Sequence, residues 1–178
     1  MKNTLLASAF VVSSVIAPLT FAATADGSLG ATSTGNVDIN LEVLDSVQIT
    51  DLQTIDFGTY GGADTGARNL GDDYCVYVNG GDSYTITPTS SNAAFELAGA
   101  SFGDTIPYDV KIVGTQTGAA AGTSATYNTA TGSFNGSSSL TCSGTNNASL
   151  DVSIAEQDIR DATTDTYADT LILVVSPI

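Results

Sequence analysis

The stretch YCVYVNGGDSYTITPT, residues 74–89, holds two runs of β-branched and aromatic residues, YCVYV (74–78) and SYTITPT (83–89), with the turn signal NGGDS between them. Runs of this kind, bounded by Gly, Asn, Asp and Ser, are typical of short strands joined by a turn. The rest of the chain is also rich in Gly, Ser, Thr, Asn and Asp between short apolar runs. The sequence therefore predicts an all-β fold.

Similar runs recur on both sides of this stretch, at the spacing of an antiparallel β-sandwich. We expect strands at residues 36–43, 46–50, 54–60, 74–78, 83–89, 94–98, 106–113, 139–142, 148–154 and 167–175. Ser153 and Glu156 have the spacing of a capping box, which predicts a single helical turn between strands. Residues 114–138 hold few bulky apolar groups, and we expect a long, mobile loop there.

The amino-terminal residues have the pattern of a secretory signal peptide. Lys2 precedes an apolar run at residues 5–19, and small residues follow it. Cleavage is expected after Ala22 or Ala25, with a preference for Ala25, so residues 1–25 form the expected signal peptide. The apolar run is shorter than the roughly 20 residues that a membrane span needs. We therefore expect an exported, soluble mature protein.

Composition narrows the classes of function. The chain has 19 acidic and 4 basic residues, a net charge of −15, and no histidine. A strongly acidic surface repels phosphate backbones, so we expect no nucleic-acid partner. Without histidine, Ser-His-Asp triads and Cys-His dyads are excluded. A carboxylate pair of glycosidase type remains, but Glu42, Glu96 and Glu156 have no catalytic context, so we expect no enzyme, no catalytic residue and no cofactor.

Two residue groups suggest covalent or ionic sites. Cys75 and Cys142 are the only cysteines, and an isolated pair in an exported protein predicts one disulfide. Asp64, Asp72 and Asp73 lie in the loop sequence GGADTGARNLGDDY, where carboxylates could attract calcium. Arg68 in the same loop would oppose a cation. A solvated polar loop is therefore favoured, and we expect no metal site.

The segment NVDINLEV, residues 36–43, has an apolar side chain at every second position. These side chains are Val37, Ile39, Leu41 and Val43. A strand of this kind buries one face. It is either the first strand of a complete sandwich or a strand given to another molecule. We divide the mature chain into an extension, residues 26–43, and one domain, residues 44–178.

Four motifs, in order, resemble those of bacterial chaperone–usher pilins of the archaic and alternate branches, which include the spore coat protein U-like subunits. The motifs are DFGTY (56–60), CVYVNGGDSYTIT (75–87), TIPYDV (105–110) and TYADTLILVVSP (166–177). The resemblance covers most of residues 37–177. One departure is that residues 37–50 contain no cysteine, whereas the spore coat U-like pattern often has one near its first strand.

The resemblance implies an immunoglobulin-like sandwich that lacks its last strand. In that family, the amino-terminal extension of another subunit fills the open groove, after a periplasmic chaperone has held the subunit and an outer-membrane usher has received it. It therefore implies a structural subunit of a surface fimbria, exported through the periplasm, with other copies of itself as partners. Val37, Ile39, Leu41 and Val43 would be the donor side chains.

The alternative is a secreted β-sandwich binding module, such as an adhesin or a glycan-binding domain, that does not polymerise. Such modules usually present aromatic platforms. The chain has no tryptophan, and its seven tyrosines fall mostly within or beside the expected strands, where packing explains them. The fimbrial subunit is therefore the favoured interpretation.

Overall fold

The computed structural model describes residues 26–115 and 122–178. The expected signal peptide, residues 1–25, lies outside the described residues. The chain divides into two parts, Met1–Val43 and Leu44–Ile178, and each is considered by itself. In the first part, residues 26–43 contain no strand or helix.

Over residues 44–115 and 122–178, the second part contains short strands, one α-helix and two 3-10 turns. They are β1 (Val47–Thr50), β2 (Arg68–Val78), η1 (Asn79–Gly81), β3 (Ser83–Ser90), β4 (Glu96–Gly99), β5 (Thr105–Pro107), β6 (Asp109–Val113), β7 (Thr123–Ser124), β8 (Thr131–Asn135), η3 (Cys142–Gly144), β9 (Ala148–Ile154), α1 (Glu156–Asp161), β10 (Tyr167–Ala168) and β11 (Leu171–Pro177).

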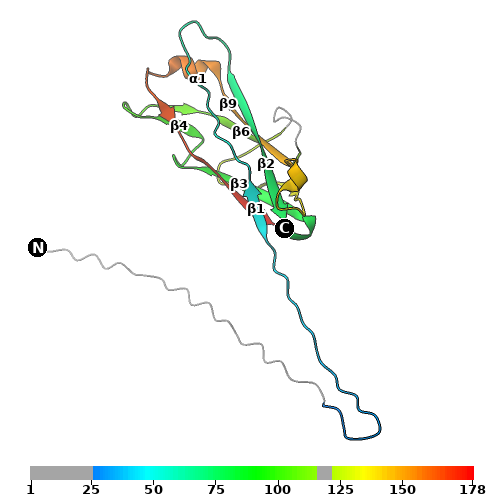
Figure 1. The fold of residues 1–178 in the computed structure, drawn as a ribbon. Helices are drawn as coiled ribbons and strands as arrows, with labels where there is room; N and C mark the ends of the chain where they lie inside the picture. Colours follow the sequence, from blue (N-terminus) through cyan, green and yellow to red (C-terminus); the bar gives the residue numbers. More distant parts are fainter. Residues whose placement is uncertain (1–25, 116–121) are drawn as a thin grey trace, which may run out of the picture. The chain divides into compact units, whose positions relative to one another are not determined.

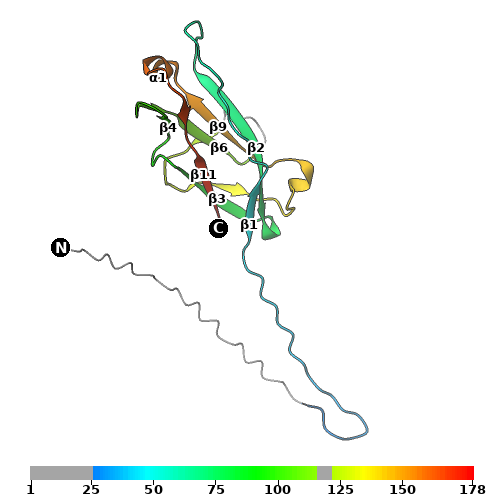
Figure 2. The same cartoon turned by 60° about the vertical axis from the view of Figure 1, so that its left-hand side comes forward.

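The strands form three antiparallel sheets. The largest has the order β1-β2-β9-β6-β7, the second β11-β3-β8, and a small one β10-β4-β5. Figure 1 shows β2, β9 and β6 side by side, and Figure 2 shows β11 beside β3. The prediction of an all-β antiparallel sandwich is confirmed.

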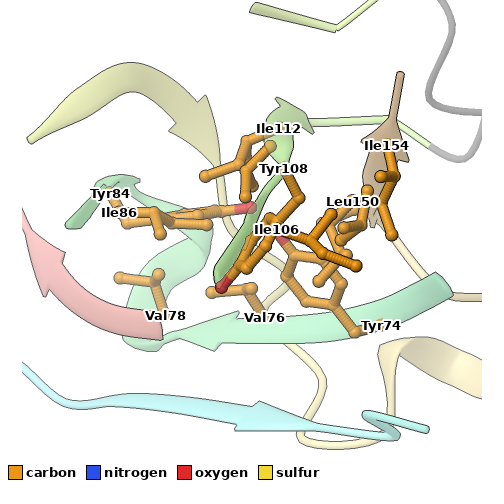
Figure 3. Close-up of a cluster of buried hydrophobic side chains, with 13 residues drawn as sticks. Tyr74, Val76, Val78, Tyr84, Ile86, Ile106, Tyr108, Ile112, Leu150 and Ile154 are labelled. Atoms are coloured by element: carbon orange, nitrogen blue, oxygen red, sulfur yellow. The ribbon is translucent and has the colours of Figure 1, made fainter. Parts of the chain in front are cut away.

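Alternate side chains of the strands meet in one apolar core. In β2 the core residues are Tyr74, Val76 and Val78, and in β3 they are Tyr84 and Ile86. Figure 3 shows these side chains converging with others from β9 and from the segment that contains β5 and β6. Burial of each large aliphatic side chain contributes about 1.5–3 kcal/mol, so the period-two pattern of the sequence determines which face of each strand is inside.

β2 changes its partner halfway along. Its residues from Arg68 to Tyr74 pair with β9, and those from Cys75 to Val78 pair with β1. At the changeover, Cys75 forms a disulfide with Cys142, as predicted. The bond closes a sequence separation of 67 residues, which corresponds to a stabilisation of about 4 kcal/mol on the chain-entropy model.

Three expected strands are absent. Residues 37–43 and 54–60 belong to no strand, and residues 139–142 form a bend, a turn and the start of η3. In the second segment, Gly58 has a φ of 68°, which interrupts an extended run. In the third, Cys142 has a φ of 47°, in the left-handed region that strands do not use.

Three other predictions need smaller corrections. The expected strand at residues 106–113 is divided between β5 and β6. The expected loop at residues 114–138 lies outside the described residues at 116–121. Of the rest, β7 pairs with β6, and β8 pairs with β3, where Phe134 packs against Tyr84 with ring centroids 5.6 Å apart. The helical turn exists as α1, but its N-cap is Ala155 without a side-chain hydrogen bond, so the capping box at Ser153 was wrong.

Candidate functional site

An open apolar groove runs along the domain between residues 52–60 and the carboxy-terminal stretch 163–173. Its volume is about 1000 Å³. Ile55 and Phe57 line it from the first segment, and Leu171 and Leu173 line it from β11. All four side chains are partly buried and pack against the core. The groove is therefore an opening into the hydrophobic interior.

Core side chains also line the groove. They are Ile106 and Tyr108 from the segment around β5, and Leu150 and Val152 from β9. Each is at most 7% exposed in the domain as it stands. An occupant with apolar side chains would thus touch the same residues that hold the two sheets together.

The groove runs along β11, an edge strand of the second sheet, and begins just past the end of β1, an edge strand of the largest sheet. β11 is an edge strand that pairs only with β3 among the described strands, from Leu171 opposite Ser90 to Pro177 opposite Tyr84. β1 is the edge strand of the other sheet, and its pairing with β2 stops at Thr50. Unpaired strand edges present free N–H and C=O groups to any additional strand.

Polar groups tie down the borders of the groove. The Gln53 N–H donates to Asp72 Oδ2 at 2.7 Å, which attaches the start of the first segment to β2. Near the other end of that segment, the Arg68 guanidinium lies over the Tyr60 ring, 5.1 Å from its centroid. These contacts hold residues 52–60 beside the groove without a strand partner.

On the opposite border, Tyr108 Oη donates to Asp169 Oδ2 at 2.6 Å. Burial, and then this hydrogen bond, raise the pKa of Tyr108 above its ordinary value. Desolvation acts to raise the pKa of Asp169, but hydrogen bonds from Tyr108, Ser90 and other donors outweigh it and lower that pKa. The pair is therefore a neutral phenol bound to an ionised carboxylate.

Two further tyrosines lie inside the core. Tyr74 and Tyr84 are fully buried, and neither hydroxyl has a hydrogen-bond partner in the structure. Burial raises the pKa of Tyr84 to about 12 and that of Tyr74 above its ordinary value. Both phenols stay protonated at neutral pH and act as packing groups.

The four side chains predicted to bind a partner are exposed. Val37 is 81% exposed, Ile39 89%, Leu41 87% and Val43 71%. Residues 37–43 belong to no strand of the structure. The amino-terminal part of the chain thus carries a two-faced segment whose apolar side has nothing to bury it.

Two of the three residues considered for calcium bind other groups, and Asp72 and Asp73 lie in β2 and not in the predicted loop. Asp64 Oδ2 accepts from the Gly61 N–H at 2.7 Å and contacts Arg68 at 3.3 Å, while Asp72 binds the Gln53 N–H. Across residues 26–115 and 122–178, no group of three potential metal-ligating side chains gathers.

Sequence reasoning missed the groove residues as a site. Ile55, Phe57, Leu171 and Leu173 fall in expected strands, where alternation marks them as core residues. They differ from ordinary core residues because at least one side of their segment has no neighbouring strand in the described structure. The alternation of apolar residues in the sequence does not show which strands lack a neighbour.

No protein-family model matches the chain, and no curated protein matches it. Within the described part of the chain, no helix is long and apolar enough to cross a membrane. The Cys75–Cys142 disulfide is typical of an oxidising compartment, which indicates an exported protein. Function is therefore inferred from the fold and the groove.

Proposed function

We propose that the protein is a structural subunit of a surface fimbria, and that residues 36–43 of one copy fill the groove of the next by donor-strand complementation. The observation that carries the proposal is the presence, in one chain, of an exposed alternating segment and an apolar groove along an unpaired strand edge. The segment offers a strand with one apolar face, and the groove offers an apolar surface beside an unpaired strand edge.

The dimensions of the two features agree. At about 3.3 Å per residue, residues 36–43 span about 26 Å when extended, and the seven-residue edge strand β11 spans about 23 Å. In an extended donor, the four apolar side chains point to one side, into the groove, and Asp38, Asn40 and Glu42 point to the other, towards water.

Side-chain burial and backbone pairing both favour the contact. Burial of four aliphatic side chains contributes about 6–12 kcal/mol in total. Association costs an estimated 4–15 kcal/mol in lost freedom, so side-chain burial alone is close to balanced. Backbone hydrogen bonds to the edge of β11, which a strand partner would form along its length, supply the remainder.

An open groove is hazardous before assembly, because an unpaired edge and exposed apolar side chains promote aggregation. The resemblance to chaperone–usher pilins supplies the remaining partners. In this proposal a periplasmic chaperone covers the groove in transit, and an outer-membrane usher receives the subunit before it reaches the cell surface.

The test compares two charged variants of the donor segment in the full-length exported chain. Ile39→Asp places a carboxylate in the apolar groove, where an unpaired charge is strongly disfavoured, and should abolish filaments. Asn40→Asp adds the same charge one residue further along, on the face that points to water, and should leave filaments intact. Assembly is measured by light scattering after size exclusion and by electron microscopy.

Filaments from Ile39→Asp equal to those of the unmodified chain would contradict the donor assignment. Absence of filaments from the unmodified chain would contradict polymerisation itself and favour the binding module. The matched pair separates loss of burial from a general effect of added charge.

A further inference from the structure

The side chain of Asn79 extends the ladder of β1 beyond the end of β2. The last paired residues of the two strands are Val47 and Val78. The next backbone donor, Asn79 N–H, bonds Ser46 O at 3.1 Å. Asn79 Oδ1 then accepts from the Ser46 N–H at 2.9 Å, and Asn79 Nδ2 donates to Leu44 O at 2.9 Å.

The local sequence explains why a side chain takes this role. After Asn79, Gly80 and Gly81 have φ values of 79° and 74°, a conformation that favours glycine. The turn carries the backbone of β2 away from β1 after Asn79, so no further peptide group lies opposite the Ser46 N–H and the Leu44 C=O, and both bond the Asn79 side chain instead. The planar amide of Asn79 replaces that peptide group, since it offers one acceptor and donors in a similar arrangement.

The three hydrogen bonds fix the short connection between the extension and the domain. Only Leu44, Asp45 and Ser46 separate Val43, the last donor side chain, from Val47, the first residue of β1. Two of these three residues are bonded to Asn79. We propose that Asn79 sets the angle between consecutive copies in the filament by holding residues 44–46 extended; this inference rests on the proposed function.

The same connection is too short for a copy to fill its own groove. If the chain reversed within residues 44–46, Val43 would lie beside Val47, and only Val37 would reach the level of residue 53. Val43 and Leu41 would lie alongside β1, where β11 approaches within 8 Å between Cα atoms. Ile39 would lie opposite Asp51, just past the end of β1. The groove opens further on, from Leu52. The occupant is therefore a second copy of this chain.

The first experiment tests the hydrogen bonds in solution, in the full-length Ile39→Asp chain that does not assemble. Amide hydrogen exchange of Ser46 is compared with and without Asn79→Ala. Loss of one hydrogen bond of average strength should speed exchange at Ser46 about five- to tenfold. Ser46→Ala is the control, because its backbone N–H and C=O still reach Asn79. Equal exchange with and without Asn79→Ala would overturn the inference.

The second experiment measures the angle between neighbouring domains in electron micrographs of filaments. Unmodified filaments and Ser46→Ala filaments should show one preferred angle, and Asn79→Ala filaments should lose that preference. Asn79→Asp keeps the acceptor for Ser46 and loses the donor to Leu44, so an intermediate spread is expected. An unchanged angle distribution for Asn79→Ala, with only a lower melting temperature, would make Asn79 a turn residue alone and overturn the inference.

A failure of this inference differs from a failure of the proposed function. The groove is untouched by Asn79→Ala, so Ile39→Asp chains with and without it should capture a peptide of residues 26–43 equally. Equal capture together with an unchanged angle distribution would reject the role of Asn79 in setting the angle, while the donor-strand proposal would stand. Absence of capture in both rejects the donor strand.

Discussion

Residues 36–43 and β11 both place their apolar side chains at alternate positions on one face, and in β11 the other face is apolar as well, but the surroundings of the two segments are opposite. In β11, Leu171, Leu173 and Val175 are partly buried against the core, while Ile172 and Val174 are 45% and 48% exposed. In residues 36–43, the apolar positions are at least 71% exposed. The difference lies in the neighbours, because β11 has β3 beside it on one edge and the extension has no strand beside it. A period-two pattern thus predicts which face of a strand is buried, but it does not identify the strand or molecule that buries it.

The largest expected effect is on the stability of the domain that contains β11 and the groove. Replacement of both cysteines, Cys75→Ser with Cys142→Ser, should lower the free energy of unfolding of the domain by about 4 kcal/mol. Urea unfolding measures the change, and the unmodified chain under reducing conditions serves as the control. An unfolding midpoint equal to that of the oxidised chain would show that the disulfide does not stabilise the domain carrying the groove.

A smaller effect tests the two faces of β11. Leu173→Asn introduces an amide into the groove, at a cost of about 1–3 kcal/mol for an unpaired polar group, and should slow filament growth about tenfold or more. Val174→Asn makes the same kind of change on the exposed face and should leave growth unaltered. The rate of increase in light scattering measures both. Equal slowing by the two variants would show that the groove face of β11 receives no partner.

The sequence predicts a strand well where its neighbouring strand lies in the same chain, and less well where that neighbour is missing. The strands at residues 83–89 and 148–154 were predicted well, since each has a buried face and a neighbouring strand within the chain. The strand predicted at residues 74–78 is only the second part of β2, whose first part was predicted as a loop. Residues 54–60 were predicted as a strand from the same kind of pattern. Ile55 and Phe57 do pack inward, yet the backbone pairs with no strand in the described structure. The candidate donor residues were named from their alternation, but the groove required three-dimensional pairing information.

The smallest effect concerns the border of the groove next to β11. Tyr108→Phe removes the hydrogen bond to Asp169 and should destabilise the domain by about 1 kcal/mol at neutral pH. Because the folded pKa of Asp169 is lowered, the contribution of the ionised carboxylate is complete above its unfolded pKa of about 4. It is lost as the pH falls through the folded value.

The difference between the unmodified chain and Tyr108→Phe should therefore shrink below about pH 4. Thermal unfolding between pH 3 and pH 7 measures it. A difference that stays constant over this range would show that Tyr108 contributes through packing and that its bond to Asp169 is unimportant for stability.

Capture of the donor peptide tests the central claim most directly. Full-length Ile39→Asp chain has an intact groove and a damaged donor, so a peptide of residues 26–43 should bind it and raise its melting temperature. At a peptide concentration of 100 times Kd the stabilisation is about 2.7 kcal/mol, which is about 8–10 °C for a domain of this size. The same peptide carrying Ile39→Asp should give no shift. A melting temperature unchanged by the native peptide, with no complex detected by size exclusion, would contradict the account.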